Sequence, residues 1–166
     1  DSLGRVSTTS YDTSYHQYPV SACRGGLCST TRYYGVNAAD LSGDFGLFGQ
    51  VQRSYDSNGE VTAATYAYDA FGRQTHLWRA GDDPNAGAPT RFLYKDAWLP
   101  FEIDTLHYQG SVLVSWERLQ YDGLGRQVEV QHPAADWTDG GPSTQHDVVQ
   151  YTLYDALGRA VRQSAP

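Results

Sequence analysis

The sequence predicts an all-β fold made of successive antiparallel hairpins. Three observations predict it: a turn motif of the form Tyr-Asp-x-x-Gly-Arg recurs along the chain, apolar and polar residues alternate with period two beside it, and no helical stripe of useful length is found. A length of 166 residues fits one domain. Because the chain opens inside a copy of the motif, we expect residues 1–166 to be a single repeat region and an internal fragment of a longer chain.

The composition narrows the class of protein. Aromatic residues make up 13% of the chain and charged residues 19%, with 17 glycines, which suits a packed β domain and not a disordered tail. A net charge of −7 argues against a nucleic acid as the main partner, because a phosphate backbone attracts basic surfaces. The chain has no apolar run long enough to span a membrane.

Copies of the turn motif differ in completeness. Residues 68–73, 121–126 and 154–159 match fully, residues 55–60 carry Glu60 in place of Arg, and residues 1–5 lack the Tyr. A weaker echo spans residues 40–43. We expect the structural turn residues to be Tyr55, Asp56, Gly59, Tyr68, Asp69, Gly72, Arg73, Tyr121, Asp122, Gly125, Arg126, Tyr154, Asp155, Gly158 and Arg159.

Each motif, called a corner below, predicts a tight turn between two strands. Asp suits the first position of a type I turn because its carboxylate can accept a backbone N–H two residues later. Gly three residues on can adopt the left-handed conformation that closes a three-residue loop through a bulge. The residue before that Gly is apolar in most copies, and a neighbouring hairpin can cover it. The Arg can reach back to the Asp carboxylate.

The strands are expected in chain order between these corners. Alternation and β-favouring residues predict strands at residues 8–11, 31–34, 50–55, 60–68, 73–79, 91–95, 112–121, 126–131 and 149–153. A change of phase near Glu117 and Arg118 predicts a bulge there. Two breaker-rich loops, residues 81–89 and 132–142, interrupt the pattern, and Trp137 in the second is expected to be a lid over the sheet or a partner contact.

Cys23 and Cys28 enclose four residues with a Gly pair. A tight loop there favours a disulfide and an oxidising, extracytoplasmic setting. Half of a zinc site and two unpaired thiols are the alternatives, although no His pair at ligand spacing accompanies the cysteines.

The full corners at residues 68–73, 121–126 and 154–159, with the partial ones, resemble the RHS or YD-repeat family. Residues 8–20 also resemble a stretch near the start of the repeat region of bacterial RHS proteins, close to the part shared with the B-type component of insecticidal toxin complexes. The resemblance covers most of the chain, although residues 84–120 carry little of the motif.

The resemblance implies a section of a spiralling β-sheet shell that encapsulates or presents another polypeptide, such as a C-terminal toxin. It implies a secreted or cell-surface location, and partners that are the remainder of the parent chain or further copies of it, because a slice of such a shell has unpaired edge strands. Teneurins use a similar shell for adhesion. The alternative is therefore an extracellular adhesion module that binds carbohydrate or protein and self-assembles at the cell surface.

No catalytic constellation stands out in the sequence. The five histidines are scattered, and the chain has neither a nucleophile elbow nor a phosphate-binding loop. RHS proteins often carry an aspartyl self-cleavage site, but residues 83–87 displace its Gly, so that activity is not carried over. Acidic residues at 40–44 and 136–139 fit no calcium-loop order. We expect a non-enzymatic protein with no cofactor and no metal.

Overall fold

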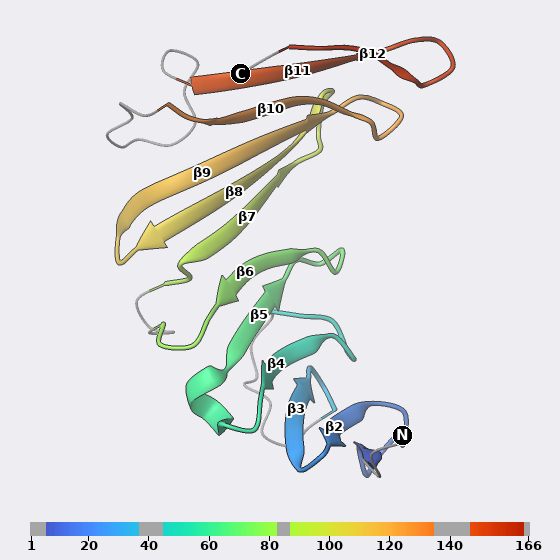
Figure 1. Cartoon of the computed structure of the whole chain (residues 1–166), viewed down its shortest axis with the longest axis vertical. Helices are drawn as coiled ribbons and strands as arrows, with labels where there is room; N and C mark the ends of the chain where they lie inside the picture. The colour runs from blue at the N-terminus through green and yellow to red at the C-terminus, as the bar shows by residue number, and fades with distance from the viewer. Residues whose placement is uncertain (1–5, 37–44, 83–86, 135–146, 165–166) are drawn as a thin grey trace. The chain divides into compact units, whose positions relative to one another are not determined.

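The computed structural model describes residues 6–36, 45–82, 87–134 and 147–164 of the chain (Figure 1). The described residues form twelve β-strands and a single 3-10 turn, with no α-helix among them. The chain divides into two compact units, residues 1–85 and residues 86–166. The predicted all-β class of successive antiparallel hairpins is confirmed.

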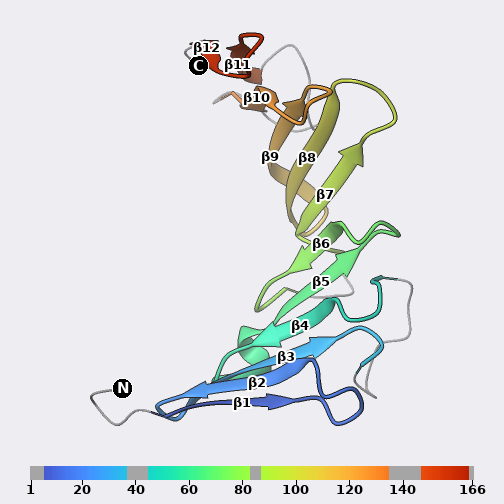
Figure 2. The same cartoon turned by 90° about the vertical axis from the view of Figure 1, so that its right-hand side faces the viewer.

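The first unit is a six-stranded antiparallel sheet whose strand order follows the chain (Figure 2). A short 3-10 turn, η1 (Gly59–Thr62), lies between the fourth and fifth strands. The strands are β1 (Ser7–Tyr11), β2 (Pro19–Arg24), β3 (Leu27–Tyr33), β4 (Val51–Tyr55), β5 (Ala64–Tyr68) and β6 (Gln74–Trp78).

The second unit repeats this plan with longer strands. Each strand pairs with the next one in the chain, and all pairs are antiparallel. The strands are β7 (Thr90–Lys95), β8 (Phe101–Gln109), β9 (Val112–Tyr121), β10 (Gln127–Pro133), β11 (Asp147–Tyr154) and β12 (Ala160–Gln163).

The structure corrects several strand predictions. β2, β8 and β12 lie where the sequence predicted no strand, and η1 replaces the first part of the strand expected at residues 60–68. The bulge expected near Glu117 and Arg118 is also wrong: both residues pair regularly with β8, and the register shifts at Val114.

Bulges follow the three full corners at a constant distance. Pairing skips Thr75, Val128 and Val161, each of which is the third residue after the corner's Gly. Because a bulge increases the local twist of a strand pair, each full corner places this twist at the same position of its hairpin. The bulge was expected at the Gly itself, and the structure places it two residues beyond the corner's end.

Each unit has a thin core because each is built from one sheet. The buried apolar residues of the first unit are Tyr33, Tyr34, Ala63 and Ala67. In the second unit they are Ala88, Leu106 and Trp116, and Trp116, at 1% exposure, is the largest fully buried side chain among the described residues. Large apolar side chains of both units are therefore exposed, among them Phe71, Trp98 and Leu124.

A disulfide joins Cys23 of β2 to Cys28 of β3, which are directly paired across the two strands. The predicted disulfide is therefore confirmed, and the zinc and free-thiol alternatives are excluded for these two residues. A disulfide is compatible with an extracellular protein. No helix in the described part of the chain is long and apolar enough to cross a bilayer.

Candidate functional site

The three full corners share one hydrogen-bond pattern. In the first, the N–H groups of Phe71 and Arg73 both donate to Oδ1 of Asp69 at 2.9 Å. The N–H of Gly72 donates to the Asp69 carbonyl at 3.0 Å, and the N–H of Asp69 donates to the Arg73 carbonyl at 2.9 Å. The corners at Asp122 and Asp155 repeat all four bonds within 0.1 Å. The aspartate thus orders the turn, as the motif predicted.

The arginine of each full corner completes this pattern. Arg73, Arg126 and Arg159 each donate from Nε to Oδ2 of their own aspartate at 2.7 Å. Burial raises the pKa of Asp69, but the N–H groups and the guanidinium of Arg73 outweigh it and lower the pKa below its usual value. The pKa of Asp122 is lowered chiefly by the Arg126 side chain, and that of Asp155 chiefly by the Arg159 N–H. The predicted return of the arginine is confirmed.

A repeated geometry also involves a tyrosine at the end of a strand. In three places the hydroxyl donates to the carbonyl of the first residue of the preceding strand, which ties two neighbouring strands together. The pairs are Tyr33 with Pro19 at 3.0 Å, Tyr68 with Val51 at 2.9 Å and Tyr154 with Gln127 at 2.9 Å. The first of these tyrosines belongs to no corner, so the tie is a feature of the strand pair and not of the motif alone.

We expect Tyr68→Phe to lower the free energy of unfolding by about 1 kcal/mol, because the half-buried Val51 carbonyl loses its hydroxyl donor. Tyr121→Phe is the matched control, since no hydroxyl bond joins Tyr121 to the described residues. Urea denaturation of both variants measures the difference, and equal losses would contradict the role of the Tyr68 hydroxyl.

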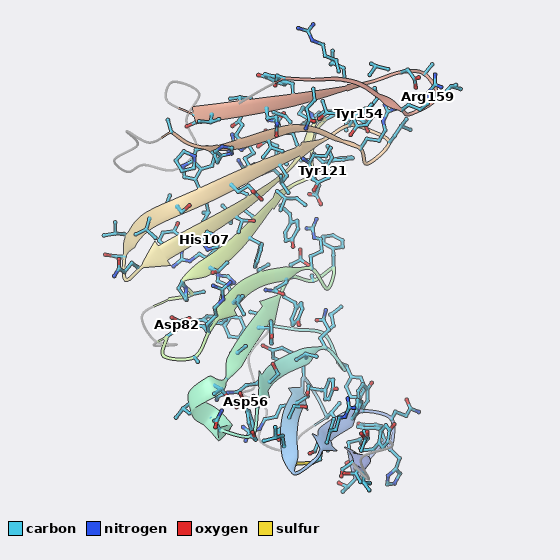
Figure 3. All side chains as sticks on the ribbon, viewed as in Figure 1. Asp56, Asp82, His107, Tyr121, Tyr154 and Arg159 are labelled. Carbon is cyan, nitrogen blue, oxygen red and sulfur yellow. A yellow bond between two sulfur atoms is a disulfide. The ribbon has the colours of Figure 1, made fainter. Side chains whose placement is uncertain are left out.

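Successive corners of the second unit also contact each other. The guanidinium of Arg126 lies 4.8 Å from the centre of the Tyr154 ring and keeps its ion pair with Asp122, Nη2 to Oδ2, at 2.6 Å. One arginine therefore connects its own turn to the tyrosine of the next corner through a cation–π contact. In Figure 3 the labelled Tyr121, Tyr154 and Arg159 lie toward the same end of this sheet.

The incomplete corner at Asp56 has a different geometry. Asp56 accepts from the Asn58 N–H and from the Thr62 hydroxyl, both at 2.8 Å, so Thr62 takes the place of the missing arginine. Glu60 instead forms ion pairs with Arg53 at 2.6 Å and Arg32 at 3.3 Å. The pKa of Asp56 is lowered, chiefly by the Asn58 N–H. Glu60 thus changes partners without breaking the turn.

Asp12, in the β1–β2 connection, is a fifth ordering aspartate that the motif did not reveal. It follows Tyr11, but residue 15 of this turn is Tyr and not Gly, so the pattern fails. The carboxylate is 5% exposed and accepts the N–H groups of Gln17 and Tyr18 at 3.0 Å and of Ser14 at 3.1 Å, with a further bond from Tyr15. In the sequence, the Tyr11-Asp12 pair is the signal that could have indicated this role.

Acid should weaken the fold through Asp12. Burial raises its pKa, but the backbone N–H donors prevail and lower the pKa from 3.8 to about 2. A group with a depressed folded pKa stabilises the fold above its unfolded pKa and loses that contribution as the pH falls through the folded value. We expect Asp12→Asn to lower stability at pH 7 and to flatten the loss of stability between pH 4 and pH 2. Denaturation midpoints across this range measure it, and parallel curves for both proteins would contradict it.

The apolar residues before the corner glycines are exposed. Phe71 is 82% exposed, and Leu124 and Leu157 are each 78% exposed. The described part of the chain contains no hairpin that covers them, in contrast to the role the sequence suggested. Together with Trp98 and Leu99, which are 85% and 62% exposed, they leave apolar side chains at the connections between strands.

The described residues form no group of three or more His, Cys, Asp or Glu side chains that could hold a metal. His107 is hydrogen-bonded to Thr90 at 3.3 Å, and His76 stacks on Trp78 with ring centres 5.6 Å apart. The corner copy at residues 1–5, the acidic stretches at 40–44 and 136–139, Trp137, and the Asp-Pro pair at residues 83–84 include positions outside the described residues.

Comparison with known proteins leaves the geometry as the main guide to function. No family model matches the chain, and no curated protein matches it.

Proposed function

We propose that the chain is a structural, non-catalytic section of an RHS-type β-shell that encapsulates or presents another polypeptide outside the cytoplasm. The observation that carries the proposal is the repetition of one corner geometry at Asp69, Asp122 and Asp155. In each, both carboxylate oxygens are bonded within the turn, so these acids order the backbone and leave no free carboxylate for acid–base chemistry.

The edge strands support a role within a larger assembly. All five residues of β1 and all four residues of β12 are exposed. Each of these strands pairs, within the described part of the chain, with one neighbour. Unpaired backbone groups at a sheet edge favour pairing with another strand. Further sections of the parent chain, or further copies of this one, are the partners that supply such strands.

Protease protection tests the proposal in a protein in which these repeats are followed by a further polypeptide. We expect a polypeptide that follows the repeats to resist protease until denaturant opens the shell, and to be cleaved rapidly when it is produced alone. Equal cleavage rates in the two forms would contradict encapsulation. The intact mass of residues 1–166 is expected to stay constant during incubation, and defined fragments would contradict a non-catalytic role.

An adhesion module that binds protein or carbohydrate and self-assembles is the second candidate. Exposed aromatic residues in the first unit favour it: Tyr15 and Phe48 are 48% and 56% exposed and pack edge to face with ring centres 5.2 Å apart. Sedimentation over a range of concentrations distinguishes it, since Phe48→Ser should then reduce self-association. The tyrosines of the corners favour the shell instead, because Tyr55, Tyr68, Tyr121 and Tyr154 are half-buried.

A further inference from the structure

A polar depression lies on the sheet of the first unit, away from the full corners. Its volume is about 300 Å³, and β3, β4, β5, β6, η1 and the turn after β6 surround it. Figure 3 labels Asp82, which lies in that turn. The side chains on which the argument depends are Arg32, Gln52, Arg53, Glu60, Trp78 and Arg79.

Strand register places these side chains together. Arg32 pairs with Arg53, Arg53 with Thr65, and Thr65 with Trp78, so four neighbouring strands each contribute one residue to a single row. Directly paired residues of antiparallel strands project from the same face of a sheet. The row therefore begins with two arginines and ends with a tryptophan.

A bulge adds Gln52 to this row. Tyr33 pairs with Val51 while Arg32 pairs with Arg53, so Gln52 is an extra residue on β4. Strict alternation would turn Gln52 away from the Arg53 side, but the bulge lets both line the depression. Gln52 is 6% exposed, which makes it a buried amide at the wall of a polar cavity.

Three buried donors in this wall have no hydrogen-bond partner: Nε2 of Gln52, Nε of Arg53 and Nε1 of Trp78. A buried donor without a partner destabilises the fold, because it has lost its hydrogen bonds to water. All three groups donate and none accepts, so a complementary ligand must present several oxygen acceptors. The three donor atoms are themselves buried, so a ligand must displace the side chains that cover them.

The charge of the lining favours an anion. Three arginines face two carboxylates, Glu60 and Asp82, in a chain whose net charge is −7. Glu60 already bridges Arg32 and Arg53, which shows that this arginine pair holds a carboxylate. Arg79 also lines the depression and forms no ion pair with another described residue.

We propose that this depression binds a small polyhydroxylated carboxylate of the size of one sugar-acid residue. The ligand carboxylate pairs with Arg79 and the Arg53 guanidinium, and the hydroxyl oxygens accept from the Gln52 amide and the Trp78 indole. The need for several acceptors besides the carboxylate favours a sugar acid over a simple dicarboxylate. The inference does not depend on the scaffold proposal, because none of these groups belongs to a full corner.

Titration of the chain with D-glucuronate, followed by ¹H–¹⁵N spectra, tests this site. We expect saturable shifts of the Trp78 indole N–H and the Gln52 side-chain amide, with a Kd on the order of 1 mM for a few hydrogen bonds. Glucose tests the need for the carboxylate and should cause no saturable shift. Glutarate, which lacks hydroxyl groups, should bind more weakly. No saturable shift with glucuronate, or equal shifts with glucose, would overturn the proposal.

Two variants that each remove one positive charge distinguish a specific binding site from non-specific electrostatic attraction. Arg79→Ala should weaken glucuronate binding about tenfold, as expected for a lost charged hydrogen bond, with the rest of the spectrum unchanged. Arg162→Ala removes an exposed arginine from β12 and should leave the affinity unchanged. Equal weakening by both variants would overturn the proposal, as would a stronger response to glutarate, which points to an acidic side chain as the natural occupant.

Discussion

Gly125→Val should lower the free energy of unfolding by about 2 kcal/mol, because Gly125 has a φ of +75°, where β-branched residues are strained. A Cβ at this position meets no heavy atom within 4 Å, so the loss comes from the backbone alone. Gly72→Val should cost more. Its φ is +81°, and an added Cβ would lie 3.0 Å from Nε2 of Gln50, which donates to the Gly72 carbonyl at 2.9 Å.

Controls within the same corner isolate the backbone effect. Gly125→Asn should cost less than Gly125→Val, since Asn adopts the left-handed region more readily. Gly123, two residues earlier, has no left-handed φ, and a Cβ there makes an ordinary 3.4 Å contact with Leu99. Gly123→Ala should therefore be neutral or slightly stabilising. If Gly125→Val and Gly123→Ala had the same stability in urea, the left-handed turn could not be what fixes the corner.

Asp104→Ala should be the most damaging single change in the second unit, with an expected loss of about 3 kcal/mol. Asp104 is 2% exposed and accepts from Arg118, Nε to Oδ1 at 2.7 Å and Nη2 to Oδ2 at 3.1 Å. Lys95 contacts Oδ2 at 2.8 Å. Removal of the carboxylate leaves the Arg118 guanidinium, whose side chain is 15% exposed, without its main partner.

Glu102→Gln is the matched control for this network. Glu102 lies two residues from Asp104 on β8, its side chain is 21% exposed, and it lies 3.1 Å from Lys95 and 3.5 Å from Arg118. A partly solvated pair of this kind contributes less than about 1 kcal/mol. Thermal denaturation of both variants gives the comparison, and a loss for Glu102→Gln as large as that for Asp104→Ala would show that burial of Asp104 is not decisive.

The pH dependence offers a second check on Asp104. Burial raises its pKa, but the hydrogen bonds from Arg118 and Lys95 prevail and lower the pKa below its usual value. The contribution of Asp104 is therefore present above the unfolded pKa and is lost as the pH falls through the folded one. Asp104→Asn should show a smaller loss of stability in acid than the unaltered chain.

The sequence predicts the corners well because their causes are local. Asp69, Gly72 and Arg73 act within six residues, and turn chemistry suffices to derive their roles. β8 was missed because Asp104 interrupts its apolar pattern, and what makes that residue acceptable is Arg118, fourteen positions away on the paired strand.

Two other features depend on register and could not be read from one segment. Asp12 orders its turn with N–H groups up to six residues away, without the Gly that marks other corners. The depression that contains Gln52 and Trp78 joins residues from four strands and requires a bulge on β4. Interactions within a turn therefore suffice to predict the turns. Strand pairing between distant segments determines which unpaired polar groups lie together.

Successive connections of an antiparallel sheet lie alternately at its two margins, which are the two ends of its strands. The two margins should differ in how well they accept inserted residues. In the second unit, the Asp122 and Asp155 corners are the β9–β10 and β11–β12 connections and therefore share one margin. The opposite margin holds the Gly110 turn between β8 and β9, whose two loop residues are exposed. A peptide grafted after Gly110 would lengthen the chain without touching an ordering carboxylate, which makes that margin the place for labels, epitopes and natural insertions.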